Sequence, residues 1–408
     1  MNFIEEYKQL ILDYLPVDPA WAEAISVTAL AGAVGRKFRA TSLTGLGLNV
    51  FYIAIGPSRL GYKTLPLKNF LIPTLSEIKR DLPASFTVEG MIEFIKEKGQ
   101  REGVIVRDEV STLFKEPKYN EGLMEFLSQM YSGRLYKRYT RKAKLEDAGQ
   151  CWISFIGATT PYVFEVLQRE HFVQGLGNRI LWLTAKGLSK KLTYEELFMN
   201  DVSEIHKLQK RLNEKTDFLR KITQLHNEIL VYPDPSNDLL TDYSNKNVEE
   251  ANKMYENDPR DLLAPYVASS TEFAIKLASL RAIGDLYPNL DLASDEIFIV
   301  MNEEHQKWAI ERVEFHKSEF EKVINKWRTR TIDKPVETDK NEIDFLLTIA
   351  KEVACPKTNK ISINQVVKRT GWYHHKAKQK LLQLAASELI KAVQVKKRNR
   401  TEFEFYLK

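Results

Sequence analysis

The chain has 408 residues, of which 43% are hydrophobic and 28% charged, and its net charge is +5. This length exceeds one ordinary domain, and the apolar share excludes a mainly disordered chain. No run of about 18 apolar residues occurs, which excludes a membrane-spanning helix. Two cysteines are too few for a disulfide framework, and the first residues include Glu5 and Glu6 where a secretory signal would be basic. We expect a cytoplasmic protein of several domains, with no membrane partner.

Positive charge is concentrated in the last part of the chain. Residues 356–408 contain thirteen Lys and Arg and three acids, so this segment carries +10 and the remainder carries −5. A basic segment attached to a slightly acidic body favours a nucleic-acid partner. A solvated lysine-rich face would explain the composition equally well.

The first half of the chain predicts helices followed by alternating strands and helices. Residues 1–40 predict an N-terminal helical segment, because apolar residues recur at helical spacing and alanine is frequent. Apolar runs of strand length follow at 48–56, 103–109, 151–161 and 178–185. Helical patterns separate the first three runs, which predicts an α/β core with a parallel sheet over residues 41–195.

The second half of the chain predicts mainly helices. Residues 196–330 carry amphipathic and charged helical patterns, which we interpret as a helical lid region. Residues 327–341 contain Pro335 and no apolar periodicity, and they predict a linker. Three helical patterns and two strand patterns then predict a winged helix, a DNA-binding plan, over residues 341–408.

The segment from Gly56 to Thr64 follows the first strand and has the composition of a phosphate-binding loop. Such a loop needs glycines that let backbone N–H groups surround a phosphate, a Lys, and a hydroxyl for Mg²⁺. Gly56 and Gly61 have the expected spacing, but Tyr62 stands where the Lys would be, so Lys63 and Thr64 come one residue late. The segment is either a phosphate loop with one residue looped out or a turn with a solvent-exposed lysine.

The second strand ends in an acid pair, Asp108 and Glu109. Nucleotide hydrolases use such a pair to hold the water shell of Mg²⁺ and to polarise the attacking water. Acids are common at strand ends, and Arg107 interrupts the apolar run. The pair gains weight because it follows the candidate loop at a distance that one or two helices would occupy.

The third and fourth strands each carry one further candidate. Thr159 and Thr160 end the third strand, where a hydroxyl would orient a water molecule or simply cap the strand. Arg179 begins the fourth strand, from which an arginine finger reaches the site of a neighbouring subunit. An ordinary surface arginine is the alternative.

A basic segment lies between the acid pair and the third strand. Its cations include Lys137, Arg138, Arg141 and Lys142, interleaved with tyrosines. Cations that meet phosphates and rings that stack on bases suit single-stranded nucleic acid. A solvated basic hairpin is equally compatible with the pattern.

In this order, the motifs of residues 20–320 resemble the AAA+ ATPases related to superfamily 3 and minichromosome-maintenance helicases of viruses, plasmids and mobile elements. The resemblance implies a P-loop core that uses ATP and Mg²⁺. It also implies a ring of identical subunits, which we expect to be a hexamer with single-stranded DNA in its channel, gripped by the basic segment.

The resemblance further implies roles for single residues. The nucleotide-binding residues would be Gly56, Ser58, Gly61, Lys63, Thr64 and Asp108, with Lys276 or Arg281 as a second sensor of the γ-phosphate. Thr64 and Asp108 would hold Mg²⁺. Glu109, Thr160 and Arg179 would take the catalytic roles of water-polarising acid, first sensor and arginine finger.

The predicted winged helix would add a second contact with DNA, for which duplex DNA is the candidate ligand. Its recognition helix would begin near Tyr373, and its cations predict mostly phosphate contacts. The candidate DNA-binding residues are His374, Lys376, Lys378, Lys380, Lys397 and Arg398. Docking against another protein within the ring is the alternative use of such a module.

Three functions follow from these predictions. The first is a DNA-dependent ATPase, a ring-forming replicative helicase that couples ATP hydrolysis to movement on single-stranded DNA. The alternative is a non-catalytic DNA-binding or regulatory protein on a degenerate P-loop scaffold, which the position of Tyr62 favours. The third is an ATP-driven loader or remodeller of a partner protein.

Overall fold

The computed structural model describes most of the chain in two compact units, residues 1–330 and 331–408. The described residues are 1–41, 46–57, 62–115, 122–133, 135–140, 144–173, 175–185, 202–290, 298–333, 340–356, 358–370, 377–378, 381, 384–385, 389–397 and 400–407. The segments predicted as 1–40, 41–195 and 196–330 all lie within the first unit.

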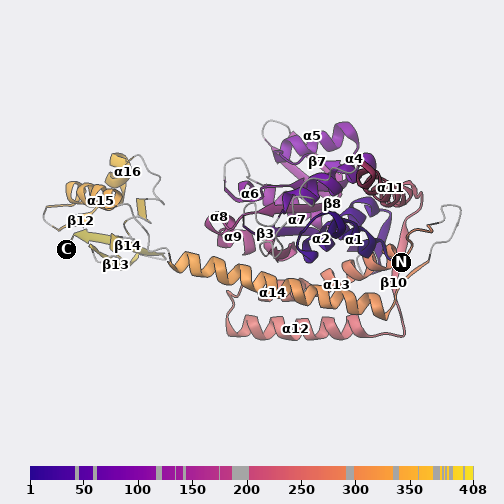
Figure 1. Ribbon diagram of the computed structural model, residues 1–408. Coiled ribbons are helices and arrows are strands. Elements are labelled where there is room, and N and C mark those ends of the chain that lie inside the picture. Colours follow the sequence, from indigo (N-terminus) through magenta and orange to yellow (C-terminus); the bar gives the residue numbers. More distant parts are fainter. Residues whose placement is uncertain are drawn as a thin grey trace. The chain divides into compact units, whose positions relative to one another are not determined.

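A five-stranded parallel sheet forms the centre of the first unit (Figure 1). Its strands, in spatial order, are β4 (Asp81–Leu82), β5 (Glu102–Arg107), β8 (Trp152–Thr159), β3 (Phe51–Ile55) and β9 (Leu181–Thr184). Every residue of β3 and β8 is buried, as expected for central strands covered on both faces. The predicted α/β class with a parallel sheet is therefore confirmed.

Helices cover both faces of this sheet. The helices around it are α1 (Phe3–Tyr14), α2 (Pro19–Val34), α3 (Thr64–Pro66), the π-helical turn η1 (Leu67–Leu71), α4 (Ile72–Glu77), α5 (Val88–Lys98), α6 (Ser111–Lys115), α7 (Leu123–Tyr131), α8 (Val163–Val166), α9 (Arg169–Val173) and the short 3₁₀ turn η2 (Gly177–Arg179). Val104 and Ile105 are consecutive in β5 and face opposite sides of the sheet. Val104 lies against Gly32 of α2, whereas Ile105 shares its side with Phe51, whose ring packs on Tyr131 of α7.

Helix α2 belongs to the core of the unit. Asp18 caps its first turn, Pro19 occupies the first helical position, and residues 21–34 are all buried. A Cβ on Gly32 would lie 2.4 Å from Cγ2 of Val104, so glycine is what allows α2 to approach β5 this closely. The predicted N-terminal helices are present, but they pack inside the α/β core.

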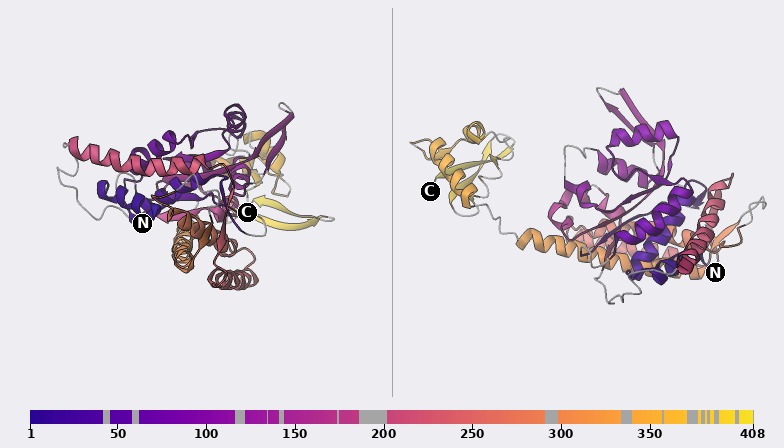
Figure 2. Two further views of the ribbon diagram at one scale, coloured as in Figure 1. Left: turned by 90° about the vertical axis from the view of Figure 1, so that its right-hand side faces the viewer. Right: turned by 45° about the horizontal axis from the view of Figure 1, so that its top comes forward.

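Two further groups of strands complete the first unit. Strands β6 (Leu135–Thr140) and β7 (Lys144–Gln150) project as a two-stranded antiparallel hairpin just before β8 (Figure 2). A second sheet has the order β11 (Ile299–Met301), β10 (Ile229–Pro233), β1 (Phe38–Ala40) and β2 (Leu46–Gly47). This sheet was not predicted, because its strands are two to five residues long and come from distant parts of the chain.

Among the described residues of the first unit, the remaining helices are α11 (Val202–Gln224), α12 (Leu239–Asn257), α13 (Ala264–Gly284) and α14 (Glu303–Asp333). Helices α12, α13 and α14 lie together on one side of the unit (Figure 1). The linker predicted from residue 327 is wrong at its start, because α14 continues to Asp333. Trp327 attaches this part of α14 to the first unit, because its ring packs 5.4 Å from that of Phe172 and its Nε1 donates to the carbonyl of Leu167.

The second unit has its own hydrophobic core. Its described elements are α15 (Lys340–Val353), α16 (Ile363–Thr370), and an antiparallel sheet in the order β12 (Lys360–Ile361), β14 (Arg400–Leu407) and β13 (Ile390–Lys397). Leu346, Val366, Leu381 and Phe405 are among its buried residues. In the described part of the chain, no helix is long and apolar enough to cross a membrane.

Candidate active site

The candidate site lies at the carboxyl ends of three neighbouring strands. Strand β8 lies between β3 and β5, and the three run parallel, so their ends meet at one edge of the sheet. This edge brings together Gly56 after β3, Thr159 at the end of β8, and Asp108 with Glu109 after β5. Ligands of open parallel sheets bind outside this edge, because the loops that follow the strands converge there.

Lys63 is buried within this edge, with 8% of its surface exposed. Its Nζ donates to the carbonyl oxygens of Gly56 and Pro57, both at 2.7 Å. Burial lowers the pKa of the Lys63 ammonium, and the nearby Glu109 carboxylate opposes this shift. The alternative of a solvent-exposed lysine is therefore wrong.

The extra residue before Lys63 takes a left-handed backbone. Tyr62 has φ 40°, a conformation that residues other than glycine rarely adopt. Its carbonyl accepts a hydrogen bond from the backbone N–H of Leu65, at 3.1 Å, at the start of the helical segment that follows. The chain thus turns sharply at Tyr62, and Lys63 then points back to the carbonyls that follow β3. Ser58 and Gly61 lie outside the described residues.

Trp21 anchors the residue that carries this ammonium. It lies in the first turn of α2, only 1% exposed, and its Nε1 donates to the backbone carbonyl of Lys63 at 3.0 Å. The role of Trp21 was not predicted, because a tryptophan in an apolar helix gives no sign of its distant partner.

The two acids after β5 take different positions. The Oε1 of Glu109 accepts hydrogen bonds from the Oγ1 of Thr159, at 2.7 Å, and from the backbone N–H of Ser111, at 3.0 Å. Asp108 is exposed, and its Oδ2 lies 3.7 Å from Nζ of Lys68 on η1. Glu109 therefore faces the threonine at the end of β8, whereas Asp108 faces the helical segment that begins with Thr64.

Of Thr159, which ends β8, and Thr160, which follows it, Thr159 is the one that contacts the acid pair. It is 1% exposed and donates its hydroxyl to Glu109. Thr160, the predicted first sensor, is half-buried, and its backbone carbonyl accepts from the N–H of Val163. The first-sensor role of Thr160 stays a prediction.

Arg179 lies at the opposite edge of the sheet. It ends the turn η2 before β9 instead of beginning the strand, and its Nη1 donates to the carbonyl of Gly175 at 2.6 Å. Because β9 runs parallel to β3, a residue that precedes β9 is remote from the Lys63 of the same chain. A role in the site of a neighbouring subunit stays a prediction.

Lys276, one of the two second-sensor candidates, is also at this opposite edge. It is 1% exposed, its Nζ donates to the backbone carbonyl of Asn49 at 3.1 Å, and it pairs with Glu272 at 3.1 Å. Asn49 precedes β3, whereas the candidate loop follows it. The prediction that Lys276 senses phosphate at the site of its own chain is therefore wrong.

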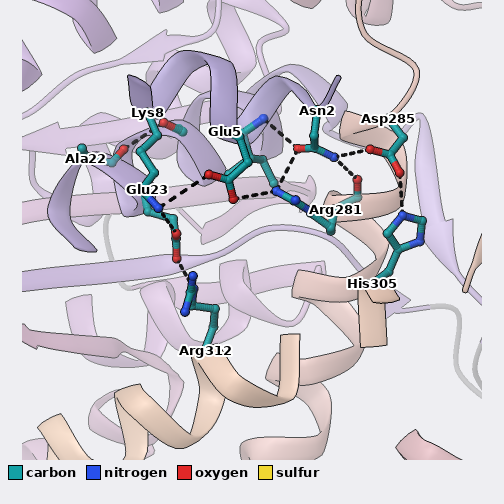
Figure 3. Close-up of polar contacts among 11 residues, drawn as sticks. Asn2, Glu5, Lys8, Ala22, Glu23, Arg281, Asp285, His305 and Arg312 are labelled. Carbon is teal, nitrogen blue, oxygen red and sulfur yellow. Dashed lines mark hydrogen bonds and ion pairs between the residues drawn. The ribbon is translucent and has the colours of Figure 1, made fainter. Parts of the chain in front are cut away.

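Arg281, the other candidate, connects α13 to the start of α1 (Figure 3). Its Nη1 donates to Oε1 of Glu5 at 2.8 Å, and its backbone carbonyl accepts from Nδ2 of Asn2 at 2.8 Å. Asn2 also donates to Asp285, which contacts His305. Arg281 thus belongs to a polar network between α13 and α1, and its role as a second sensor stays a prediction.

The candidate DNA-binding residues are described only in part. Lys137 and Arg138 lie on β6, Lys397 ends β13, and Lys378 is half-buried in a helical position. Arg141, Lys142, His374, Lys376, Lys380 and Arg398 lie outside the described residues.

The residues at the candidate site suit a nucleotide that carries Mg²⁺. The ammonium of Lys63 suits phosphate oxygens, and the Asp108 carboxylate and Thr64 hydroxyl are oxygen donors of the kind Mg²⁺ prefers. Among the described residues, no group of three or more His, Cys, Asp and Glu could hold a metal. A Mg²⁺ here would therefore depend on phosphate oxygens and water for its remaining ligands.

Comparison of the chain with protein-family models and with curated proteins found no match.

Proposed function

We propose that this protein is an ATP hydrolase that acts as the motor of a ring-forming DNA helicase. The observation that carries the proposal is the meeting of the buried Lys63 ammonium with the Glu109 carboxylate at the carboxyl edge of a parallel sheet. A buried lysine whose ammonium is satisfied by two backbone carbonyls is prepared to exchange them for phosphate oxygens, which are stronger acceptors.

In this proposal, the residues of the site divide the work of phosphoryl transfer. Lys63 stabilises the charge on the transferred phosphate, and Glu109, oriented by the Thr159 hydroxyl, holds the attacking water and accepts its proton. Asp108 and Thr64 would hold the Mg²⁺, which neutralises charge on the phosphate oxygens when bound. Arg179 would complete the site of the next subunit in a hexamer.

Two further features support DNA as the partner. The antiparallel hairpin of β6 and β7 carries the basic segment, and it leads directly into β8, whose far end contacts Glu109. The described part of the second unit includes α15, α16 and a three-stranded antiparallel sheet, and residues 356–408 contain thirteen Lys and Arg. These elements have the order expected of a winged helix, which we assign to duplex DNA.

The decisive experiment measures ATP hydrolysis with and without single-stranded DNA. We expect hydrolysis that DNA stimulates in the wild type, and a loss of about 100-fold or more in Lys63→Ala and Glu109→Gln, because each removes a group that acts on the transition state. The matched controls are Lys98→Ala and Glu97→Gln, exposed charges of α5, which should keep wild-type rates.

The absence of ATP hydrolysis in the wild type would overturn the proposal. If the wild type hydrolyses no ATP under any DNA condition but still binds DNA, the chain is a DNA-binding scaffold. Stimulation by a protein partner and not by single-stranded DNA would instead indicate a loader or remodeller.

A further inference from the structure

Asn49 lies at the amino end of β3, where the two arms of the basic hairpin join the first unit. Its side chain is buried, and its Nδ2 lies 3.2 Å from the carbonyl oxygen of Met130, 2.9 Å from that of Tyr131 and 3.1 Å from that of Ile153. One amide group thus contacts three backbone carbonyls from two segments that are far apart in sequence.

These two segments are the two ends of the hairpin. Tyr131 is the last residue of α7, and the chain passes from it through Ser132 and Gly133 to β6. Ile153 is the second residue of β8 and follows β7 with two residues between. The Asn49 amide therefore holds the entering and the leaving arm at a fixed separation.

A second layer of contacts holds Asn49 itself. The Nζ of Lys276 donates to the Asn49 backbone carbonyl at 3.1 Å and lies 3.5 Å from the centre of the Tyr131 ring. Glu272, one turn earlier in α13, pairs with this ammonium. Helix α13 is thereby attached to the same point at which the hairpin is held.

The strands that begin at this point end at the candidate active site. Strands β3 and β8 pair in parallel from Phe51 with Phe155 to Ile55 with Thr159. At the far end of this pair, β3 leads to the Lys63 loop and Thr159 donates to Glu109. Two hydrogen-bonded strands, about 17 Å long at ~3.3 Å per residue, thus connect the base of the hairpin to the candidate active site at the carboxyl edge of the sheet.

We propose that Asn49 is a positioning residue that couples the DNA-binding hairpin to ATP turnover, with Lys276 as its support. This inference rests on the proposed function, because it assigns a task to the hairpin and to the site of that motor. Asn49 touches neither nucleotide nor DNA in this proposal. It fixes the hairpin base to β3, which leads to the Lys63 loop, and to β8, which ends at Thr159. A displacement of the hairpin base would therefore be transmitted along both strands to the candidate site.

The test compares Asn49→Ala with Ser154→Ala in the full chain. Ser154 is a matched control, because its Oγ accepts from the backbone N–H of Val50, which directly precedes β3, and this hydrogen bond joins β8 to that segment and not to α7. Both variants lose one buried polar side chain at the same junction. Basal hydrolysis, single-stranded DNA stimulation and amide hydrogen exchange of residues 135–150 are measured for each.

We expect both variants to keep basal hydrolysis within about twofold of the wild type. Stimulation by single-stranded DNA should fall at least about fivefold in Asn49→Ala only, the size of an ordinary coupling between sites. Its hairpin amides should also exchange faster than those of Ser154→Ala. Lys276→Met, which removes the ammonium and keeps the apolar stem, should lower stimulation in the same direction and provides the test if Asn49→Ala does not fold.

The outcomes separate this inference from the proposed function. A wild type that hydrolyses no ATP overturns the proposed function and the coupling with it. If single-stranded DNA stimulates ATP hydrolysis equally in the wild type, Asn49→Ala and Lys276→Met, the coupling alone is overturned. Equal losses in Asn49→Ala and Ser154→Ala would show that the junction is merely structural and would also overturn it.

Discussion

His316 shows how tertiary packing fixes the charge state of a single residue. It lies on α14, its Nδ1 donates to the carbonyl of Trp182 on β9 at 3.0 Å, and its ring packs 5.5 Å from that of Tyr52. Burial lowers the pKa of the His316 ring from 6.5 to about 4. The ring is therefore neutral at pH 7, and the Nδ1–H is available to hold α14 against the edge strand.

This lowered pKa predicts an acid-dependent loss of stability. Between pH 6.5 and 4 the unfolded chain binds a proton that the folded chain does not, so the contribution of His316 is present above pH 6.5 and is lost as the pH falls through 4. The loss amounts to about 3 kcal/mol at ~1.4 kcal/mol per pKa unit. His316→Asn keeps a donor near Trp182 and does not titrate.

The measurement is denaturant unfolding of the wild type and His316→Asn at several pH values from 7.5 to 4. The free energy of unfolding of the wild type should fall relative to that of the variant as the pH decreases. Parallel profiles for the two proteins would show that His316 does not titrate in this way.

At the scale of elements, the approach of α2 to β5 depends on Gly32. Because a Cβ there would lie 2.4 Å from Val104, Gly32→Ala should force the helix away from the sheet. We expect a loss of about 1–3 kcal/mol of unfolding free energy, as for other overpacked cores, despite the better helix propensity of alanine.

The control for this prediction is Gly90→Ala in the exposed first turn of α5. A Cβ on Gly90 would meet only Oγ1 of Thr87, at 3.3 Å, so stability should change by less than about 1 kcal/mol. Thermal unfolding of both variants and of the wild type measures these changes in stability. Equal stability of Gly32→Ala and the wild type would mean that α2 can shift without cost.

At the scale of the whole molecule, the two compact units have separate hydrophobic cores. The proposed site lies in the first unit, and the C-terminal cluster of thirteen Lys and Arg lies in the second. A chain that ends at residue 330 should therefore fold and keep basal ATP hydrolysis, while its affinity for duplex DNA decreases.

Duplex binding by the full chain should also weaken steeply with salt. Phosphate contacts release counterions, so affinity should fall at least about tenfold between 50 and 200 mM salt if several lysines bind phosphates. Fluorescence anisotropy with labelled duplex measures both effects. Equal duplex affinity of the full and truncated chains would assign the DNA contact to the first unit.

Local patterns in the sequence were enough to predict the α/β core and the edge of the sheet at which the candidate residues meet. Alternating strand and helix patterns predicted a parallel sheet, and the loop after β3 and the acids after β5 necessarily lie at its carboxyl edge. These features depend on the type of each element and on strand direction, and both can be inferred from local sequence patterns.

Tertiary packing sets which side chains share that edge. It buries Lys63 against two carbonyls, brings Thr159 to Glu109, places Lys276 at the opposite edge of the sheet, and joins Arg281 to the start of α1. It also pairs β1 with β10, as in Phe38 with Ile229, and β10 with β11, as in Val231 with Ile299. The physical reason is that helical periodicity shows which face of a helix is buried, but the partner of that face is fixed by long-range packing that no local pattern contains.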